Sequence, residues 1–581
     1  MPLFNKQMLD RKRRLQDVVF CIIFALTAIF LAWKCRYSIG NIDESFYLTI
    51  PYRLFMGDSL FAHEWHLSQM SGFLTLPFVS LFVTMNQGTE GIILAMRYFT
   101  VFVQCALSLF AYCRLRKYSW TGAACAAISF MVYIPFGIMA LSYNSMGIMA
   151  LIAMGLLFLP NQKHDRIALF FAGISFSAAV LCCPYLAFVF MLYLTAVIVW
   201  MCLPDSKRRS AGPAAEILSV RRALPYFVGI VTAAAAFVLF ICSRASIDSI
   251  IAAFPHIMND PEHPAISLLS KSIRFLGAIL KATPLCKYLY PLLFALFSIC
   301  LLDKRRKDRG ALYFFIAAMP TLILMADHYR TLHYINMVMW SANILGLFVF
   351  LLSKKRISRL LFLLFWIPGM AYSFCLHLTS NQAFYAISSA SSVSLFASMA
   401  MIAVFTGEIA GEIRPGFFKK CAAALACILL VFQLASQFEL RYSSVFWDSG
   451  MSKLTVSLDE GIEAGLYTSE ERADSYRRGL KVIDKVKELN VRKVLFFSKS
   501  TWMYLCEDFE FATYSAWLSG VNENALARLK EYYSLHPDKT PDAAFIDLEN
   551  KDMALQFSKA FHYELTQIHD GFLLRKTSAS L

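Results

Sequence analysis

The stretch that decides the fold is residues 18–47, which reads VVFCIIFALTAIFLAWKCRYSIGNIDESFY. Residues 18–33 are apolar apart from one threonine. A bilayer core about 30 Å thick needs roughly 17 to 25 helical residues per crossing, so this run predicts a membrane span. The run lacks a small-residue cleavage site, ends in Trp33 and is followed by Lys34 and Arg36. We therefore expect a retained signal anchor and not a cleaved signal peptide.

Apolar runs of this kind recur along the whole chain of 581 residues. The composition is 58% apolar and only 16% charged, with a mean hydropathy of +0.54. Soluble domains carry about a quarter charged residues, so these values exclude a soluble globular protein. We predict an α-helical polytopic membrane protein with about 13 transmembrane helices. The predicted spans are 18–33, 94–113, 120–141, 145–159, 167–183, 185–203, 224–242, 285–302, 311–326, 335–352, 360–376, 393–406 and 421–438.

The basic residues indicate the orientation of these spans. Lys and Arg number 55 against 40 Asp and Glu, which gives a net charge of +15. They gather in short runs between apolar segments, such as 11–14, 207–209 and 304–307. Cytoplasmic loops of membrane proteins hold an excess of Lys and Arg. We therefore expect a plasma-membrane protein whose N-terminus lies on the cytoplasmic side. This placement also argues against a nucleic-acid partner.

An odd number of crossings places the chain after residue 438 outside the membrane. We expect a transmembrane domain over 1–438 and an extracytoplasmic domain over 439–581. Two long outer loops are expected at 34–93 and 243–284, and the first contains an apolar segment, 73–85, that is too short to span. In the tail, helix-type and strand-type runs alternate, which predicts a small α/β domain. Thr468 and Glu471 predict a capping box before its first helix.

The most informative residues are Asp43 and Glu44, just outside the first span. Two adjacent carboxylates beside a membrane are costly to desolvate, so they are expected to meet water, a metal or a polar substrate. Helical neighbours point about 100° apart, so only one of them faces a given ligand. We expect both to belong to a catalytic site, with Asp43 accepting a proton from an attacking hydroxyl and Glu44 holding the local fold or a neighbouring group of the site. A solvated acidic pair at a helix N-terminus is the alternative interpretation.

Metal ligands could come from His63, Glu64 and His66 in the same loop. His63 and His66 share a helical face, and His with carboxylate suits Zn²⁺, or Mn²⁺ or Mg²⁺ where oxygen ligands dominate. An interfacial segment with Trp65 at the headgroup level explains the same residues. No glycine-rich phosphate loop is present, so no nucleotide cofactor is expected.

Cations for an anionic ligand are expected at Arg53, Arg97 and Arg330, because each maps to an outer loop or an outer span end. Arg330 lies in a polar cluster with His328. A guanidinium can bind a phosphate with two parallel hydrogen bonds, although snorkelling to lipid phosphates is the alternative for each arginine. Acceptor or sugar contacts are assigned to Tyr47, Tyr143 and Asn144, and turn formation accounts for the last two equally well.

The first outer loop resembles the signature of the GT-C glycosyltransferases, specifically the branch of protein O-mannosyltransferases and lipid A aminoarabinose transferases. The matching residues are Asp43-Glu44, Tyr47, Arg53, Gly57-Asp58, and Arg97 at the start of the second span. Gln69-Met70-Ser71-Gly72 stands where the family often has Lys-Pro-Pro. The predicted plan of thirteen spans with an outer C-terminal domain is also similar to the family.

This resemblance implies an enzyme that takes a sugar from a polyprenyl-phosphate carrier and passes it to an acceptor on the outer face, with Asp43 as the base. The acceptor would be a glycan, lipid or protein of a bacterial cell envelope, and the reaction would be inverting. A transporter, flippase or lipid-linked glycan polymerase is the main alternative, with the acidic pair as a gating or proton-coupling site. A mere anchor for the tail would need one span, not thirteen.

Overall fold

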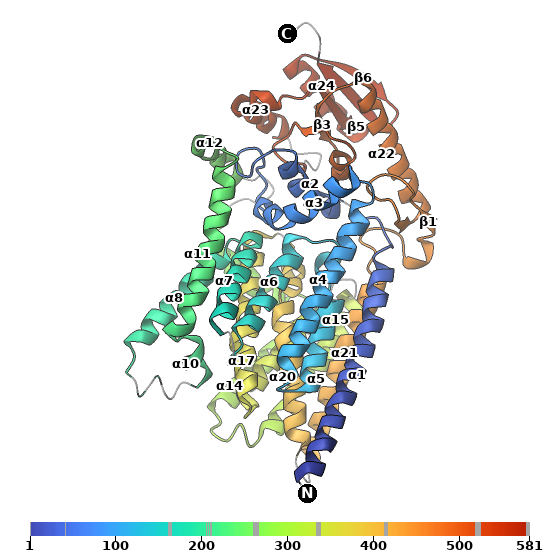
Figure 1. Cartoon of the computed structure of the whole chain (residues 1–581). Coiled ribbons are helices and arrows are strands. Elements are labelled where there is room, and N and C mark those ends of the chain that lie inside the picture. Colours follow the sequence, from blue (N-terminus) through green and yellow to red (C-terminus); the bar gives the residue numbers. More distant parts are fainter. Residues whose placement is uncertain are drawn as a thin grey trace.

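The computed structural model is a bundle of long helices with a small α/β domain at one end (Figure 1). It describes residues 2–40, 42–160, 165–204, 206, 208, 212–259, 266–332, 338–380, 382–411, 416–517 and 524–576. The N-terminus lies at the end of the bundle that is remote from the α/β domain (Figure 1).

Among the described residues, nine helical stretches are long and apolar enough to cross a membrane. Each of them coincides with one of the predicted runs. They are α1 (Pro2–Lys34), α4 (Ile92–Leu115), α5 (Trp120–Val132) with the turn η2 (Pro135–Gly137), α7 (Asp165–Cys182), α11 (Val220–Cys242), α15 (Gly310–Leu332), the continuous stretch α17 (Arg356–Leu361), η3 (Phe362–Trp366) and α18 (Ile367–Thr379), α20 (Ser392–Ala410) and α21 (Phe417–Ser443).

The other four predicted spans are also helices, but they are shorter. At 1.5 Å per residue, a helix of about 15 to 17 residues reaches only about 22–26 Å, less than the thickness of the hydrocarbon core. The count of thirteen crossings therefore stays a prediction. These helices are α6 (Tyr143–Phe158), α8 (Leu186–Cys202), α14 (Cys286–Leu302) and α16 (Val338–Leu352).

The outside of the bundle is apolar. Phe188 on α8, Leu239 on α11 and Phe294 on α14 are 69%, 70% and 72% exposed. Large side chains of this kind on so many helices would be very costly in water, so this surface faces lipid. The chain is accordingly a multi-pass membrane protein.

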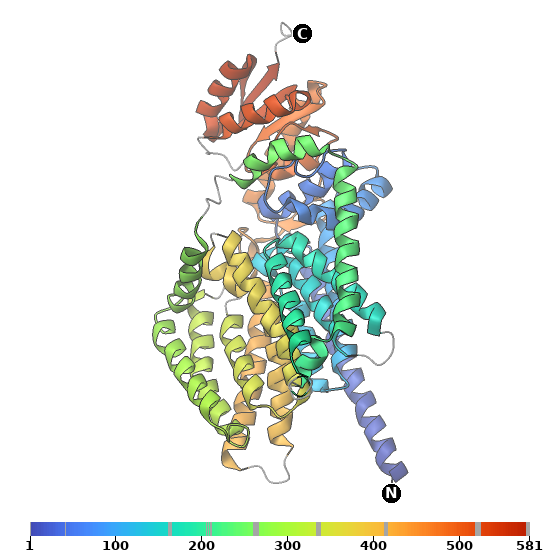
Figure 2. The same ribbon diagram turned by 90° about the vertical axis from the view of Figure 1, so that its left-hand side faces the viewer.

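The first outer loop forms two helices, α2 (Ile42–Phe55) and α3 (Gly72–Asn86), which lie between the end of the bundle and the α/β domain (Figures 1 and 2). The predicted short apolar segment 73–85 is thus helical. Gly72 allows α2 and α3 to approach closely, because a Cβ atom there would lie 2.4 Å from the Ile50 side chain. This contact helps to set the position of α2.

The tail forms the predicted α/β domain. Its five-stranded sheet has the order β4-β3-β5-β7-β6, with β3 parallel to β4 and β5, and β7 antiparallel to its neighbours. The strands are β3 (Lys493–Phe497), β4 (Glu510–Phe511), β5 (Ala543–Asp547), β6 (Tyr563–Ile568) and β7 (Gly571–Lys576), with a separate hairpin of β1 (Val456–Ser457) and β2 (Tyr467–Thr468). The helices are α22 (Glu470–Glu488), α23 (Ala525–Leu535) and α24 (Lys551–Phe561).

The start of α22 differs from the predicted capping box. Ser469 is the N-cap residue, and its side chain makes no cap hydrogen bond. The hydroxyls of Thr468 and Ser469 instead donate to the Asp448 carboxylate, at 2.5 and 2.6 Å. Asp448 competes for these hydroxyls because the chain leaving α21 passes beside them, and the predicted box is therefore wrong.

The tail packs on α2 through the segment that follows β3. The turn η5 (Thr501–Leu505) contacts α2, and the hydroxyls of Thr501 and Ser45 are 2.7 Å apart. The Tyr52 hydroxyl of α2 also donates to Asp508, at 3.2 Å. The first outer loop is thus held against the tail.

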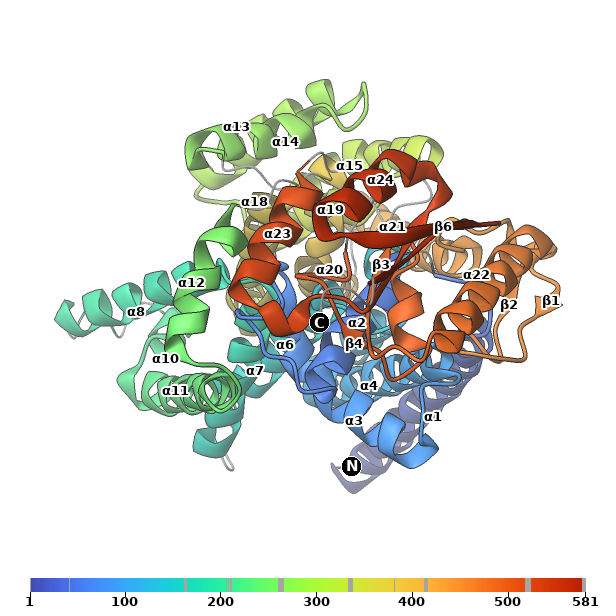
Figure 3. The ribbon, with the colours of Figure 1, turned by 90° about the horizontal axis from the view of Figure 1, so that it is seen from above.

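The second outer loop contains α12 (Ile247–Met258) and α13 (Leu268–Leu280). The ring of His256 on α12 stacks on Trp65 of the first loop, with centroids 4.8 Å apart. Arg528 of the tail donates to the His256 carbonyl at 2.7 Å. Seen from above, α12 lies next to α23 (Figure 3), so the two loops and the tail meet above the bundle.

Candidate active site

The site is built around the first turns of α2. Asp43 and Tyr47 are four residues apart on this helix, so their side chains lie on one face. Tyr47 packs edge-on against Tyr143, the first residue of α6, with ring centroids 5.5 Å apart, and the two hydroxyls share a hydrogen bond. The Asp43 charge acts on both tyrosines. The structure thus brings Tyr143 beside two residues that lie about a hundred positions earlier in the sequence.

Asp43 is half-buried, and burial raises the pKa of its carboxyl from 3.8 to about 6. Within the described part of the chain, no cation lies against it and no group donates it a hydrogen bond. A carboxylate in this state is ionised near neutral pH and is basic enough to take a proton from a hydroxyl.

The capping box of Ser142 and Ser145 fixes the first turn of α6, where Tyr143 and Asn144 lie. Asn144 is buried and hydrogen-bonds to Tyr143, while its Oδ1 atom has no partner. An unpaired amide oxygen beside a tyrosine hydroxyl can accept a hydrogen bond from a ligand hydroxyl. The sugar contacts of Tyr47, Tyr143 and Asn144 stay a prediction.

A third element, α19 (Ala383–Ala390), adds Tyr385 to this group. The Tyr385 hydroxyl influences Tyr47 electrostatically, and its ring packs on Phe136 at 4.7 Å. No motif in the sequence pointed to this tyrosine, because only the packing of α19 against the bundle brings it to α2.

Glu44 is turned away from Asp43 and into the protein. Its two oxygens accept hydrogen bonds from Nε and Nη2 of Arg97, at 2.8 and 2.5 Å, and one also accepts from the amide of Ala140 at 3.0 Å. Arg97 also donates to the carbonyls of Cys35 and Ser38. Both side chains are fully buried. Glu44 therefore anchors α2 to α4, as its predicted role in the local fold requires.

Arg53 anchors the other end of α2 to the tail. Its guanidinium donates to Asp58 at 2.5 Å, to Glu64 at 3.0 Å, and to the Thr513 carbonyl and the Tyr532 hydroxyl at 2.6 and 3.0 Å. We call these five residues, with Lys539, which is 2.5 Å from Asp58, the Arg53 cluster. Burial alone would raise the pKa of Asp58, but Arg53 and Lys539 hold it below its usual value.

These contacts correct two predicted phosphate ligands. Four of the five N–H groups of Arg53 are taken by protein acceptors, and Arg97 is bound to Glu44 and to backbone carbonyls. Both guanidinium groups are buried, so neither presents a face to a ligand. These two charged residues of the loop motif hold the loop in place and do not face a ligand.

The predicted metal site is not formed by its three residues. Glu64 binds Arg53, while the ring Nδ1 atoms of His63 and His66 hydrogen-bond to Ser59 and Ser68. Burial lowers the pKa of His63 to about 4. Throughout the described ranges, no three His, Cys, Asp or Glu side chains come close enough to share a metal ion.

The two remaining predicted phosphate ligands, Arg330 and His328, lie in different surroundings. Arg330 is exposed in the last turn of α15, near the outer end of the bundle. His328 is buried between Cys286 Sγ and Ser341 Oγ, each 3.2 Å from a ring nitrogen. His328 thus serves packing, and Arg330 is the predicted phosphate ligand that stays accessible.

Other residues were not identified from the sequence. Tyr532 and Lys539 reach α2 only through the fold of the tail. Arg441 near the end of α21 and Glu463 in the β1–β2 hairpin are buried near Arg97. An arginine in the last turn of an apolar span is a signal that could have pointed to Arg441.

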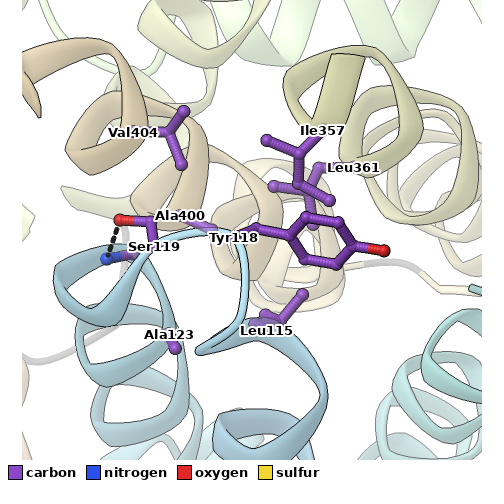
Figure 4. A pocket seen from close by; sticks show the side chains of 9 residues that line it. Leu115, Tyr118, Ser119, Ala123, Ile357, Leu361, Ala400 and Val404 are labelled. Carbon is purple, nitrogen blue, oxygen red and sulfur yellow. Dashed lines mark hydrogen bonds between the residues drawn. The ribbon is translucent and has the colours of Figure 1, made fainter. Parts of the chain in front are cut away.

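A small pocket at the opposite end of the bundle does not belong to this site (Figure 4). It lies where α4 passes to α5, beside Ser119, whose Oγ accepts the N-cap hydrogen bond of Gly122 at 3.1 Å. Its lining is mainly aliphatic and contains no carboxylate, histidine or cation.

The chain matches no protein-family model and no curated protein. Among solved structures, it is similar to ArnT from Cupriavidus metallidurans in the apo state, with 11% identity, 97% of this chain and 98% of that chain covered, and a TM-score of 0.46. The same protein bound to undecaprenyl phosphate gives 10% identity, the same coverage and a TM-score of 0.45.

It is also similar to the Archaeoglobus fulgidus oligosaccharyltransferase tethered with an acceptor peptide. The identity is 10%, the coverage 96% of this chain and 74% of that chain, and the TM-score 0.44. Both proteins are of the GT-C superfamily that the first loop resembles. With TM-scores below 0.5, these likenesses by themselves establish no activity for this chain.

Replacing Arg53 by Met tests the Arg53 cluster. The change leaves Asp58 and Glu64 buried without their cation, and breaking a buried pair in this way costs about 3–5 kcal/mol. We expect a clearly lower Tm in detergent and faster proteolysis of the tail. Arg330→Met, which removes an exposed arginine, is the control and should behave as wild type. Equal Tm values for both variants would refute the anchoring role.

The two neighbouring carboxylates should respond differently to amide substitution. Glu44→Gln leaves Arg97 without its counter-charge. It should lower the free energy of unfolding, also by about 3–5 kcal/mol, and therefore the Tm. Asp43→Asn removes a carboxylate that has no cation partner, so its Tm should equal or exceed that of wild type. Heating in detergent followed by size-exclusion chromatography measures both. A drop for Asp43→Asn as large as for Glu44→Gln would contradict the assignment.

Proposed function

We propose that the protein is a membrane glycosyltransferase that moves a sugar from a polyprenyl-phosphate donor to an acceptor outside the plasma membrane. The observation that carries this proposal is the state of Asp43. Its carboxylate is half-buried, has a raised pKa and meets no cation among the described residues. It lies on the same face of α2 as Tyr47, which packs against Tyr143 of α6. A carboxylate with only a structural role would be paired, as Glu44 is.

The proposed reaction is a single displacement that inverts the sugar carbon. The acceptor hydroxyl attacks the anomeric carbon, and its proton passes to Asp43. The new bond forms between the acceptor oxygen and this carbon, while the bond from the carbon to the phosphate oxygen breaks. The electron pair of that bond leaves with the polyprenyl phosphate. Tyr47, Tyr143 and Asn144 are proposed to hold the sugar hydroxyls.

The surroundings of Asp43 suit a donor that arrives through the membrane. Activated nucleotide sugars stay in the cytoplasm, so transfer on the outer face needs a lipid-borne donor whose tail can lie along the apolar bundle. Arg330, exposed at the outer end of α15, is the cation proposed for the donor phosphate. A divalent cation bound at the same phosphate would supply positive charge that stabilises the leaving group.

The orientation follows from the same proposal. The tail domain and the first loop lie at one end of the bundle, and the basic N-terminal segment lies at the other (Figure 1). The excess of Lys and Arg in the loops of the latter end supports a cytoplasmic location for that end. The acceptor, a glycan, lipid or protein of the cell envelope, would then approach from the end that carries the tail.

Asp43→Asn tests the proposed base directly. Removing a general base lowers the rate by roughly 10²- to 10⁴-fold, and the measurement is release of polyprenyl phosphate from a panel of lipid-linked monosaccharides by purified protein. Glu90→Gln, an exposed carboxylate of the same loop, is the matched control and should keep full activity. Equal release by Asp43→Asn and wild type would remove Asp43 as the base. No release from any donor would favour a transporter, flippase or polymerase.

The pH profile should report the same carboxylate. A base must be ionised to accept a proton, and the pKa of Asp43 is raised to about 6. We therefore expect kcat/KM to fall about tenfold per pH unit below pH 6 and to be flat just above pH 7. A profile that stays flat down to about pH 4.5 would mean that Asp43 is not the titrating base.

A further inference from the structure

Three cations meet inside the outer end of the bundle, away from Asp43. Lys34 ends α1, Arg97 lies in the second turn of α4, and Arg441 lies in the last turn of α21. Their side chains are 0%, 0% and 1% exposed. Each influences another electrostatically, since the charges of Arg441 and Arg97 both act on Lys34. We call these three residues the Arg441 cluster.

The three cations differ in the hydrogen-bond acceptors that they meet. Arg97 is fully bound by Glu44 and by backbone carbonyls. Among the described residues, the sulfur of Met451 is the one hydrogen-bond acceptor of Lys34, at 3.0 Å. All three nitrogen atoms of the Arg441 guanidinium are buried, and no described residue accepts a hydrogen bond from them. Arg441 is thus a buried charge without a hydrogen-bond partner in the part of the protein that the structure describes.

The nearby carboxylates do not supply that partner. Glu44 is taken by Arg97, and Asp448 accepts from the Thr468 and Ser469 hydroxyls. Burial raises the pKa of Glu463 to about 8, so it is mostly neutral at pH 7. With Glu463 protonated, none of the three carboxyl groups near the cluster supplies a hydrogen-bond acceptor to the Arg441 guanidinium.

Burying an unpaired cation is costly, whereas a buried charge that is paired and hydrogen-bonded is tolerated. The carboxyl-terminal end of the α21 dipole favours a cation in its last turn. It offers no acceptor to the guanidinium, however, because none of the three nitrogen atoms meets a carbonyl. An anion beside Arg441 would satisfy both the charge and these donors.

We propose that the Arg441 cluster binds one small inorganic anion of the halide class, with chloride as the physiological ion. The full enclosure of Arg441 argues for a small ion, because a lipid phosphate would need an open path for its chain. The Arg441 guanidinium carries a single charge, which a monovalent ion balances. The ion would join α1, α4 and α21 directly behind the Glu44–Arg97 pair, and so support α2.

The test is the Tm of purified full-length protein at pH 7 and constant ionic strength, with sodium gluconate replaced stepwise by sodium chloride. A ligand that binds only the folded state raises the Tm, and the effect increases with concentration. We expect wild type to gain about 2 °C or more, with bromide acting like chloride. Arg441→Met should lose the gain, whereas Arg330→Met, at an exposed arginine of the same end, should keep it.

Three outcomes overturn the proposal. The first is a Tm of wild type that does not depend on chloride, and the second is an unchanged gain in Arg441→Met. The third is a gain produced through Arg441 by sodium phosphate or undecaprenyl phosphate but not by halides, which would assign a phosphate group to the cluster. If Arg441→Met does not fold, anomalous scattering from wild-type crystals soaked in bromide decides, because the expected peak lies beside Arg441. None of these results depends on glycosyl transfer.

Discussion

The buried ion pair between Glu44 and Arg97 is the interaction on which the geometry of the site depends. It ties the amino end of α2 to a membrane helix, while the Arg53 cluster ties the other end of α2 to the tail. Glu44 and Arg53 are nine residues apart, about 14 Å along a helix. Fixed at both ends, α2 holds its amino-terminal turn in one orientation, and Asp43 is the carboxylate there that has no cation partner.

This arrangement explains why adjacent acidic residues have different chemistry. Both face a loss of hydration, but Glu44 gains two charge-assisted hydrogen bonds from Arg97, whereas Asp43 gains none. The raised pKa of Asp43 is the result. Arg441 is also a buried charged group, and no described residue accepts a hydrogen bond from it. The proposals place a ligand at both positions, a substrate beside Asp43 and an ion beside Arg441.

The tail takes part in the site through its packing on the first loop. The Thr513 carbonyl, Tyr532 and Lys539 complete the Arg53 cluster, and Thr501 contacts α2 at Ser45. A movement of the tail would therefore shift α2. This contact also explains why a chain with so many membrane helices carries a soluble domain with its own sheet: the domain covers the loop that bears the catalytic candidate.

The sequence by itself determined the apolar helices and the α/β tail, and it singled out Asp43 and Glu44 as candidates. The length of an apolar run and the periodicity of a strand or helix are local properties, so they can be predicted without knowledge of the packing. Only the tertiary structure decided which charges pair. Arg53 and Arg97 looked like phosphate ligands, and His63, Glu64 and His66 looked like metal ligands, because residue type and spacing do not say what a side chain meets. The partners come from α4 and from the tail, and the approach of such distant segments is set by packing across the whole chain.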